Sequence, residues 1–427
     1  MLQAVANAFK LPDLRRKLLF TLGILVVFRF LAHVPIPGIQ YDALRQLFQT
    51  NQLLGLLDMF SGGAMSDFSI MAMGVYPYIT ASIIFQLLEP IIPQLAELKK
   101  EGEAGQNKLN QYQHLLTIPL AFLQGYGQTV VLQRSGVISN FGLAPNVLLP
   151  TLSILITLTA GTMLAIWLGE LIDEQGVGNG ISLIIFGGIV ADIPGRVGQL
   201  LVSSPWSLIV FLALTVITVV AIVFVQEGQR RIPVQYAKRV RGNKIYGGQS
   251  THIPLQVNSA GMIPLIFAVS IMIFPGVIAS YFIYSQTEWV ARIANFVYKL
   301  FDSSSVTYWL IYFFLVIGFT YFYTDTVFRQ QNLAENLQRQ GGFIPGIRPG
   351  RNTDEYLNRV VQRITFVGAL FLGTVAILPF IAQKTTGTQI MLITSTGLLI
   401  VVGVVLDSMK QLEAQLLMRH YEGFIKR

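Results

Sequence analysis

Residues 204–226 read SPWSLIVFLALTVITVVAIVFVQ and contain no charged side chain. A helix of about 20 apolar residues is long enough to cross the hydrocarbon core of a bilayer. Residues 146–170, NVLLPTLSILITLTAGTMLAIWLGE, repeat the pattern and carry one charge, at the last position. These two stretches decide the fold class, and the chain is predicted to be an all-α integral membrane protein.

Composition supports this class. Of the 427 residues 53% are hydrophobic and 12% are charged, whereas soluble domains carry about 25% charged residues. The chain has no cysteine, which excludes disulfides, thiolate metal sites and cysteine nucleophiles. Its four histidines are scattered singly and form no HExxH pair, which argues against a zinc hydrolase. No metal or cofactor is therefore expected.

Ten apolar stretches are predicted to cross the membrane. The fifth is short and rich in glycine, and without it the termini would face opposite sides. The first lacks the small-residue cleavage pattern of a signal peptide and is retained as a permanent span. The predicted spans are residues 18–34, 68–92, 112–133, 146–170, 180–195, 204–226, 257–284, 305–328, 360–381 and 387–409.

Basic residues segregate across these spans. The N-terminus, loops 2/3, 4/5, 6/7 and 8/9 and the C-terminus hold four, three, none, six, six and four lysines and arginines, 23 of the 30 in the chain, where Arg363 at the start of the ninth span is counted with loop 8/9. The opposite side holds six, and Arg29 within the first span is the last. Because positive loops remain in the cytoplasm, both termini are expected there, in a multi-pass protein of the inner (plasma) membrane.

Loop 6/7, about residues 226–257, contains QEGQRRIPVQYAKRVRGNKIYGGQSTHIP. Its short alternating runs predict a β-hairpin that turns near Arg241-Gly242-Asn243. A cationic loop can serve only as a topology signal that touches anionic lipid, but the turn chemistry favours a docking element for ribosomal RNA or an acidic protein. The basic residues of this element are Arg230, Arg231, Lys238, Arg239, Arg241 and Lys244.

Loop 8/9, about residues 329–358, contains GGFIPGIRPG at 341–350. Glycine and proline fix the turns around one arginine, Arg348. A rigid loop that carries one guanidinium group suggests a placed contact rather than a spacer.

Charged residues are nearly absent from the centres of the spans. Arg29, Glu89, Glu170, Asp325 and Asp407 lie near predicted ends, where snorkelling would suffice. A proton-coupled transporter would need a buried carboxylate or histidine. The pattern therefore weighs against secondary transport.

Residues 53–78, LLGLLDMFSGGAMSDFSIMAMGVYPY, are apolar but interrupted by glycines and Pro77. They predict a short helix, a flexible break and a spanning helix. Such a segment can be a re-entrant stopper inside the protein or an amphipathic surface helix. Glycines at 176–180 and prolines in the seventh span hint at an inverted repeat of five and five spans.

Eight ordered motifs resemble the SecY/Sec61-alpha family of protein-conducting channel subunits over essentially the whole chain. They are FRFLAHVPIPG, MFSGGAMSDFSIMAMGVYPYITASIIFQLLEP, LAELKKEGE, WLGELIDEQGVGNGISLIIFGGIV, GQRRIPVQYAKR, QSTHIPLQVNSAGMIPLIFA, GGFIPGIRPGRNT and GLLIVVGVVLD. The resemblance implies an hourglass pore between two pseudo-symmetric halves, residues 1–195 and 196–427, and a protein that is a channel rather than an enzyme.

In this family isoleucines form a constriction ring. The motifs assign this role to Ile79, Ile83, Ile181, Ile185, Ile266 and Ile400. The first two pairs are spaced i, i+4, so each lies on one helix face, and branched aliphatic side chains suit a dry seal. Taken singly, an isoleucine in a span more often faces lipid or core, so only the resemblance assigns these six.

The resemblance also implies a plug and a lateral gate. The plug would be about residues 53–72 and would include Met59, Phe60, Gly62, Gly63 and Met65. In the gate the second and third spans would face the seventh and eighth, with Asn258 and Phe274 at matching positions. Asn258 could equally be a helix N-cap.

Implied partners are the small subunits SecE and SecG, the motor ATPase SecA, the ribosome, secretory preproteins with their signal sequences, and anionic lipids. Secretory chains would cross the pore, and transmembrane segments would leave sideways through the gate. Gln106, Asn107, His114 and Asn243 stand where the family often has basic residues, which weakens the expected cytosolic docking. The rival functions are a small-solute transporter and a membrane-embedded enzyme.

Overall fold

The computed structural model describes residues 9, 11–50, 58, 61–142, 144–203, 205–236, 239–241, 244–246, 250–283, 287–301, 305–386 and 391–425. Each predicted span overlaps one observed helix. These helices are α2 (Pro12–Ala32), α5 (Tyr76–Leu88), α7 (Glu103–Arg134), α8 (Leu148–Gln175), α9 (Gly180–Ser203), α10 (Pro205–Glu227), α11 (Ile263–Phe282), α13 (Val306–Gln330), α15 (Arg351–Thr386) and α16 (Met391–Ile425).

Four shorter helices and five strands complete the described elements. The helices are α3 (Tyr41–Thr50), α6 (Pro93–Lys100), α12 (Glu288–Leu300) and α14 (Leu333–Arg339). The strands are β1 (Gln229–Tyr236), β2 (Arg239–Arg241), β3 (Lys244–Tyr246), β4 (Ser250–Gln256) and β5 (Gly342–Phe343).

Length and apolar composition qualify four helical segments of the described residues as complete spans. They are Glu103–Arg134, Leu148–Gln175, Val306–Arg339 and Arg351–Leu378. A fifth results if Tyr76–Leu88 and Pro93–Lys99, bent by 105°, count as one span. Shorter apolar helices at Gly180–Gly195, Thr215–Glu227 and Ile263–Ile273 coincide with three further predicted spans. The prediction of ten is consistent with this set.

The second span differs from its prediction at both ends. Residues 68–75 form turns, with positive φ at Phe68 (42°) and Gly74 (50°). The α-helix begins at Tyr76, where Pro77 occupies the first turn and needs no backbone donor. It ends at Leu88, because Pro90 and Pro93 prevent continuation along the same axis.

The helix that contains the fifth span continues beyond the predicted end at residue 195. Asn179 Oδ1 accepts a hydrogen bond from the Ser182 amide, 3.0 Å, and so satisfies a free donor at the start of α9. The helix then runs through Pro194 to Ser203. The expected division of the chain at 195/196 therefore falls inside α9 rather than in a connector.

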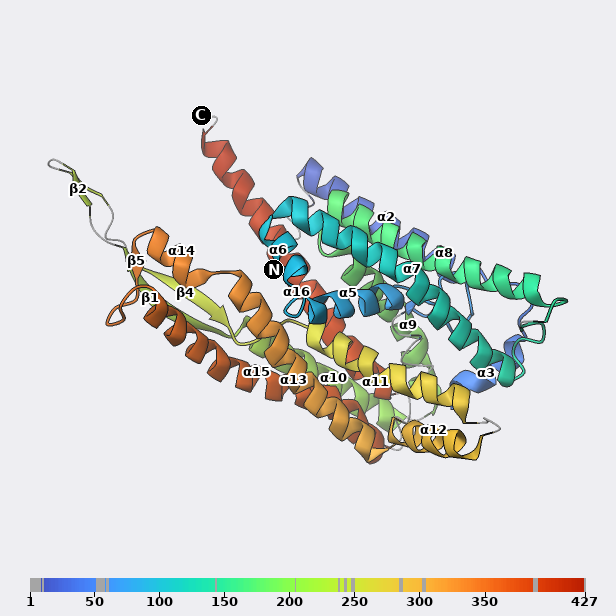
Figure 1. Ribbon diagram of the computed structural model, residues 1–427. Helices are drawn as coiled ribbons and strands as arrows, with labels where there is room; N and C mark the ends of the chain where they lie inside the picture. The colour runs from blue at the N-terminus through green and yellow to red at the C-terminus, as the bar shows by residue number, and fades with distance from the viewer. Residues whose placement is uncertain are drawn as a thin grey trace.

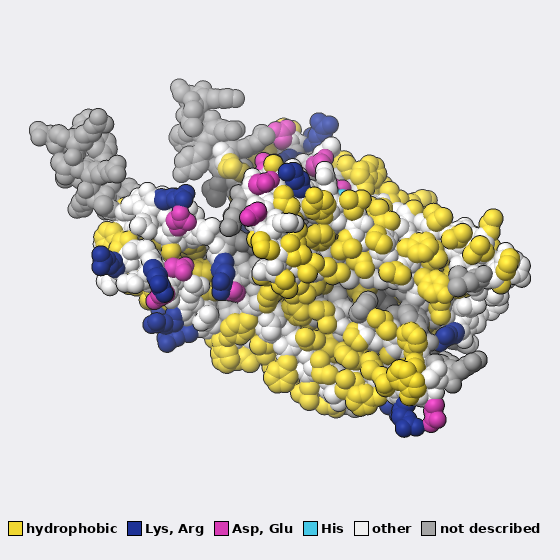
Figure 2. All heavy atoms as spheres, in the orientation of Figure 1, with side chains coloured by type: hydrophobic (Ala, Val, Ile, Leu, Met, Phe, Trp, Pro, Cys, Tyr) yellow, Lys and Arg dark blue, Asp and Glu magenta, His cyan; other side chains and the backbone are white. Residues whose placement is uncertain are grey.

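The two ends of the bundle differ in charge. In Figure 1 the sheet, α14 and the C-terminus lie at the left end, which we call the basic end, and α3 and α12 lie at the opposite end. Figure 2 shows hydrophobic side chains over the helical body, with most charged side chains of this face at the basic end. On α10, Ile217 and Phe224 are 65% and 81% exposed, as expected of side chains that face lipid.

Loops 6/7 and 8/9 form one structure at the basic end. β1 lies between β4 and β5, antiparallel to both, with Ile232 opposite Ile253 and Gln235 opposite Phe343. The predicted hairpin is confirmed, and its outer pair β2–β3 sets Arg241 opposite Lys244. A separate hydrophobic core joins the sheet to the neighbouring helices through Ile232, Val234, Leu255, Phe328, Ala334, Leu337, Ile344, Leu357 and Val361. We call this unit the loop module.

A glycine at the centre of α8 allows the turns before α5 to pack closely. A Cβ atom added at Gly161 would lie 1.7 Å from the carbonyl oxygen of Ile70. Gly161→Val is therefore expected to destabilise the fold by about 3 kcal/mol, the upper part of the overpacking range. The measurement is the temperature at which purified protein loses its monodisperse state. Gly318→Val on α13, where nothing lies within 4 Å, is the control, and equal melting of the two variants would contradict this packing.

Candidate functional site

The six isoleucines assigned to the ring come from four helices, α5, α9, α11 and α16. Five are buried, at 7% exposure for Ile79 and Ile266, 4% for Ile83 and 1% for Ile185 and Ile400, and all five belong to one hydrophobic core cluster. Helix α9 packs on α16, and α5 packs on α11. The four helices thus direct branched aliphatic side chains into a shared dry interior.

Ile181 occupies a different environment. It is partly buried at the border of the same cluster. Its Cγ1 atom lies 3.1 Å from the position that a Cβ atom of Gly169 would take. One side of Ile181 therefore rests on the backbone of α8.

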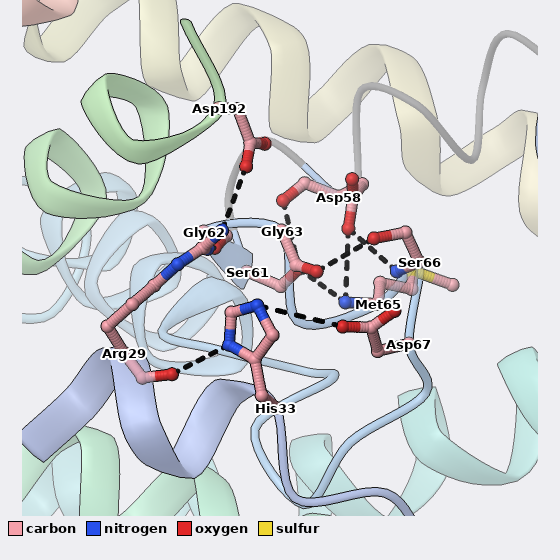
Figure 3. Close-up of polar contacts among 10 residues, drawn as sticks. All are labelled: Arg29, His33, Asp58, Ser61, Gly62, Gly63, Met65, Ser66, Asp67 and Asp192. Carbon is pink, nitrogen blue, oxygen red and sulfur yellow. Dashed lines mark hydrogen bonds and ion pairs between the residues drawn. The ribbon is translucent and has the colours of Figure 1, made fainter. Parts of the chain in front are cut away.

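The plug assigned from the sequence is described at Asp58 and at residues 61–66, which we call the plug segment. Met59 and Phe60 lie outside the described residues. Asp58 organises the turn, because its Oδ1 atom accepts hydrogen bonds from the amides of Met65 (3.0 Å) and Ser66 (2.8 Å). Met65 is 1% exposed and belongs to the same core cluster as the five buried isoleucines. Figure 3 shows how these polar contacts close the turn.

Two charged residues on neighbouring helices, one on α2 and one on α9, hold the plug segment. Arg29 of α2 donates from Nη1 to the carbonyl oxygen of Gly62, 2.6 Å, and its Nη2 lies 3.2 Å from Oδ1 of Asp192 on α9. Asp192 thus fixes the guanidinium group that binds the plug backbone (Figure 3). The expectation that Arg29 merely snorkels is wrong, because its side chain is used inside the protein.

The backbone that follows the plug segment is also fastened, by hydrogen bonds to the residues after α2. The amide of Ile36 donates to the carbonyl of Phe68 (3.1 Å), and the amide of Ile70 donates to the carbonyl of Val34 (3.0 Å). Phe68 is fully buried despite its positive φ of 42°. Packing therefore holds a backbone conformation that a bulky residue adopts only at a cost.

A seam separates α5 and α7 from α11 and α13. Tyr76 of α5 donates its hydroxyl to the carbonyl of Ser270 on α11, 3.3 Å. A cavity of about 250 Å³ lies along the seam between α5, α6, α7 and α13, with Glu89 and Lys99 in its wall. These two form an ion pair of 2.6 Å. A larger apolar groove, about 610 Å³, runs between Leu87 of α5 and one face of α13.

Of the two residues expected at the gate, the structure describes the side chain of Asn258 but not that of Phe274. Asn258 precedes α11 and is 5% exposed, and its Nδ2 donates to the carbonyl of Gly261, 3.0 Å. It is not the N-cap, which is Met262. Its Cα lies 3.8 Å from where a Cβ of Gly368 on α15 would be. Phe274 lies within α11, but its side chain is outside the described residues.

The residues expected to dock a partner are described in part, on the strands and the turn of the loop module. Arg230 and Arg231 are exposed on β1. Arg239, Arg241 and Lys244 fall in β2 and β3, and their side chains, like all of Lys238, are outside the described residues.

Arg348 is exposed at the tip of the glycine-proline turn. Its carbonyl accepts a hydrogen bond from Oγ1 of Thr353, 3.0 Å, and Gly346 and Gly350 have φ of 80° and 100°. The turn is therefore held through the Arg348 carbonyl rather than the Arg348 side chain, which is left to project from a fixed position.

Three residues that replace the family's basic residues near loop 2/3 lie in helix α7. His114 Nε2 lies 3.2 Å from Oε1 of Glu170 on α8, and its ring contacts Tyr78, with centroids 5.7 Å apart. His114 thus joins helices and does not belong to a docking loop. Gln106 and Asn107 lie in the first two turns of α7, and Asn243 is outside the described residues.

The sequence prediction missed the contact between Arg29 and Asp192. The predicted topology could have indicated this contact, because it places Arg29 and Asp192 near the same face of the membrane, at the ends of the first and fifth spans. Ionisable residues inside spans usually have a partner, and these two have opposite charges. Among the described residues, no group of three or more His, Asp and Glu side chains is suited to hold a metal ion.

Comparisons with known proteins agree on one family. The SecY family model matches residues 69–409. The protein translocase subunit SecY of Halalkalibacterium halodurans is 47% identical over 446 residues, with 100% of each chain covered. The same subunit of Streptomyces scabiei is 44% identical over 441 residues, again with 100% of each chain covered. That of Thermotoga maritima is 42% identical over 440 residues, with 100% of this chain and 98% of the relative covered.

Solved structures share the fold at low sequence identity. A structure described as that of a protein conducting channel has a TM-score of 0.62 and 18% identity, with 96% of each chain covered. Sec61 in the canine ribosome-channel complex from the endoplasmic reticulum has a TM-score of 0.57 and 16% identity, also with 96% of each chain covered.

Proposed function

The chain belongs to the SecY family of protein translocase subunits, and on that premise we propose that it is the central protein-conducting channel of a Sec translocase. The observation that carries the proposal is that isoleucines from α5, α9, α11 and α16 lie buried, together with Met65 of the plug segment, in the main hydrophobic core of the bundle. Such a cluster seals a pore at rest and offers no strong binding site to a passing polypeptide.

Translocation then depends on partners for free energy. The loop module is the docking surface for a SecA-type motor or a ribosome, and SecE and SecG are the small membrane subunits of the complex. Support comes from the exposed arginines of β1 and from Arg348 in the turn after β5, because the sheet that joins these strands has its own core. A bound partner favours the open state of a pre-existing equilibrium.

Release into lipid uses the seam between α5/α7 and α11/α13. A signal sequence enters there, the contact between Tyr76 and the Ser270 carbonyl breaks, and the apolar groove beside Leu87 widens. Segments rich in leucine partition into the bilayer, whereas charged segments do not. Ile79, Ile83, Ile181, Ile185, Ile266 and Ile400 line the constriction, and Asn258 and Phe274 belong to the gate.

The proposed setting is the inner (plasma) membrane, with the basic end and both termini in the cytoplasm. Residues 1–195 and 196–427 approximate the two halves of the channel, with the junction moved toward the end of α9 at Ser203. Anionic lipids border the loop module.

Reconstitution tests this function against the rival solute transporter. Vesicles that hold the chain with its small partner subunits are given a SecA-type motor, ATP and a preprotein. Protease-protected preprotein is expected inside them. If no preprotein enters while a small solute accumulates against its gradient, the channel proposal is wrong.

A further inference from the structure

The plug segment is seated on helix α9 by contact between backbones. A Cβ atom added to Gly188 would lie 2.0 Å from Cα of Gly62, so the plug touches α9 where a side chain is absent. Gly62 and Gly63 have φ of 69° and 81°, a conformation that glycine adopts without strain. The plug segment can therefore lie flat on the face of α9 that carries Gly188.

Asp192 follows Gly188 by one helical turn and shares this face. Its Oδ1 atom lies 3.0 Å from where a Cβ of Gly63 would be, and Nη1 of Arg29 lies 2.9 Å from the same point. The side chains of Arg29 and Asp192 are 30% and 22% exposed. Both charges are thus held against the glycine pair, with little space for water between them and the plug.

We propose that Arg29 and Asp192 are positioning residues that latch the plug segment in the closed channel, with Gly188 as its seat. The inference rests on the proposed channel function. Asp192 orients the guanidinium group, and Arg29 binds the Gly62 carbonyl, so loss of either charge weakens one grip on the plug. The latch sets the fraction of channels that are open without a signal sequence.

The position of the latch has a consequence for gating. Arg29 and Asp192 lie on α2 and α9, which pack against each other, whereas the seam divides α5 and α7 from α11 and α13. Separation along the seam leaves the contacts of α2, α9 and the plug segment intact. Plug release is therefore a second step, which can be altered without a change in the gate.

Two kinds of variant test the latch in the reconstituted complex with its partner subunits. Asp192→Asn and Arg29→Gln remove one charge each, and Asp192→Glu keeps the pair. Gly188→Ala places a methyl group against the plug backbone, and Gly195→Ala, where nothing lies within 4 Å, is its control on the same helix. Each variant is first checked for a monodisperse complex.

The readouts are resting ion efflux from proteoliposomes and transport of a preprotein with a defective signal sequence. Asp192→Asn and Arg29→Gln are expected to raise both by up to about fivefold, the scale of a partly exposed ion pair, and Gly188→Ala is expected to raise them more. Asp192→Glu and Gly195→Ala should match the wild type. A residue with only a structural role would lower transport of every preprotein.

If the wild-type complex transports preprotein but Asp192→Asn and Gly188→Ala change neither the resting ion efflux nor the requirement for a functional signal sequence, the latch is overturned. Failure of the wild-type complex to move any preprotein would instead reject the proposed function. The two failures are therefore distinguishable in one set of vesicles.

Discussion

Replacement of Ile83 and Ile185 together by glycine is expected to raise the resting ion conductance by roughly tenfold or more, because it removes two aliphatic side chains from the proposed constriction. Both residues are nearly inaccessible to solvent, at 4% and 1% exposure, on different helices of the cluster. Their loss leaves a space that water can enter, and a wetted constriction conducts ions. Single-channel recording in planar bilayers measures the effect.

The control for this variant must carry the same cost to helix stability. Glycine in a helix interior costs about 1 kcal/mol relative to alanine. Ile156 of α8 and Ile217 of α10 are 60% and 65% exposed on the outer surface, so the pair Ile156→Gly and Ile217→Gly carries that cost away from the ring. Equal conductance of the two double variants would show that Ile83 and Ile185 do not line the constriction.

Arg348→Glu is expected to reduce motor-driven preprotein transport by about tenfold, because the change reverses a charge on a rigid turn of the proposed docking surface. The hydrogen bond between Thr353 and the Arg348 carbonyl involves the backbone, so the turn itself should survive. Initial transport rates at several motor concentrations give the measurement, and the loss should shrink as the motor concentration rises.

Arg292→Glu on α12 is the matched control, since this arginine is 80% exposed at the opposite end of the bundle. It should leave transport unchanged, and both variants should retain a low resting conductance. Transport by Arg348→Glu at the wild-type rate would remove this arginine from the docking surface.

Much of the architecture was predictable because the membrane imposes simple constraints. Apolar stretches such as 204–226 must form helices, since backbone groups in lipid need internal partners. The segregation of lysines and arginines predicts which loops share an end, and the loop module lies at the same end as the C-terminus (Figure 1). The hairpin of loop 6/7 was also predictable, from alternation and turn chemistry.

Other features depend on contacts between distant residues. Loops 6/7 and 8/9 were expected as separate elements, but β5 pairs with β1 through Gln235 and Phe343. Neither loop carries a local signal for this pairing. The late start of α5 depends on Phe68, whose positive φ is held by burial rather than by its residue type.

The candidate site divides in the same way. The spacing of Ile79 with Ile83 predicts a shared helix face, but nothing local distinguishes a pore face from a lipid face. The partnership of Arg29 with Asp192 spans 163 positions and requires that α2 and α9 be neighbours. Spatial proximity, rather than residue type, turns these charges into a plug contact.

The central claim is that a polypeptide crosses this chain through the isoleucine cluster. Because the sequence has no cysteine, one introduced cysteine gives an unambiguous crosslinking site. A preprotein that carries a thiol-reactive group and is arrested midway should form adducts with Ile83→Cys and Ile185→Cys. It should form none with Ile217→Cys on the lipid-facing surface of α10. Adducts at Ile217→Cys but at neither ring position would contradict passage through the constriction.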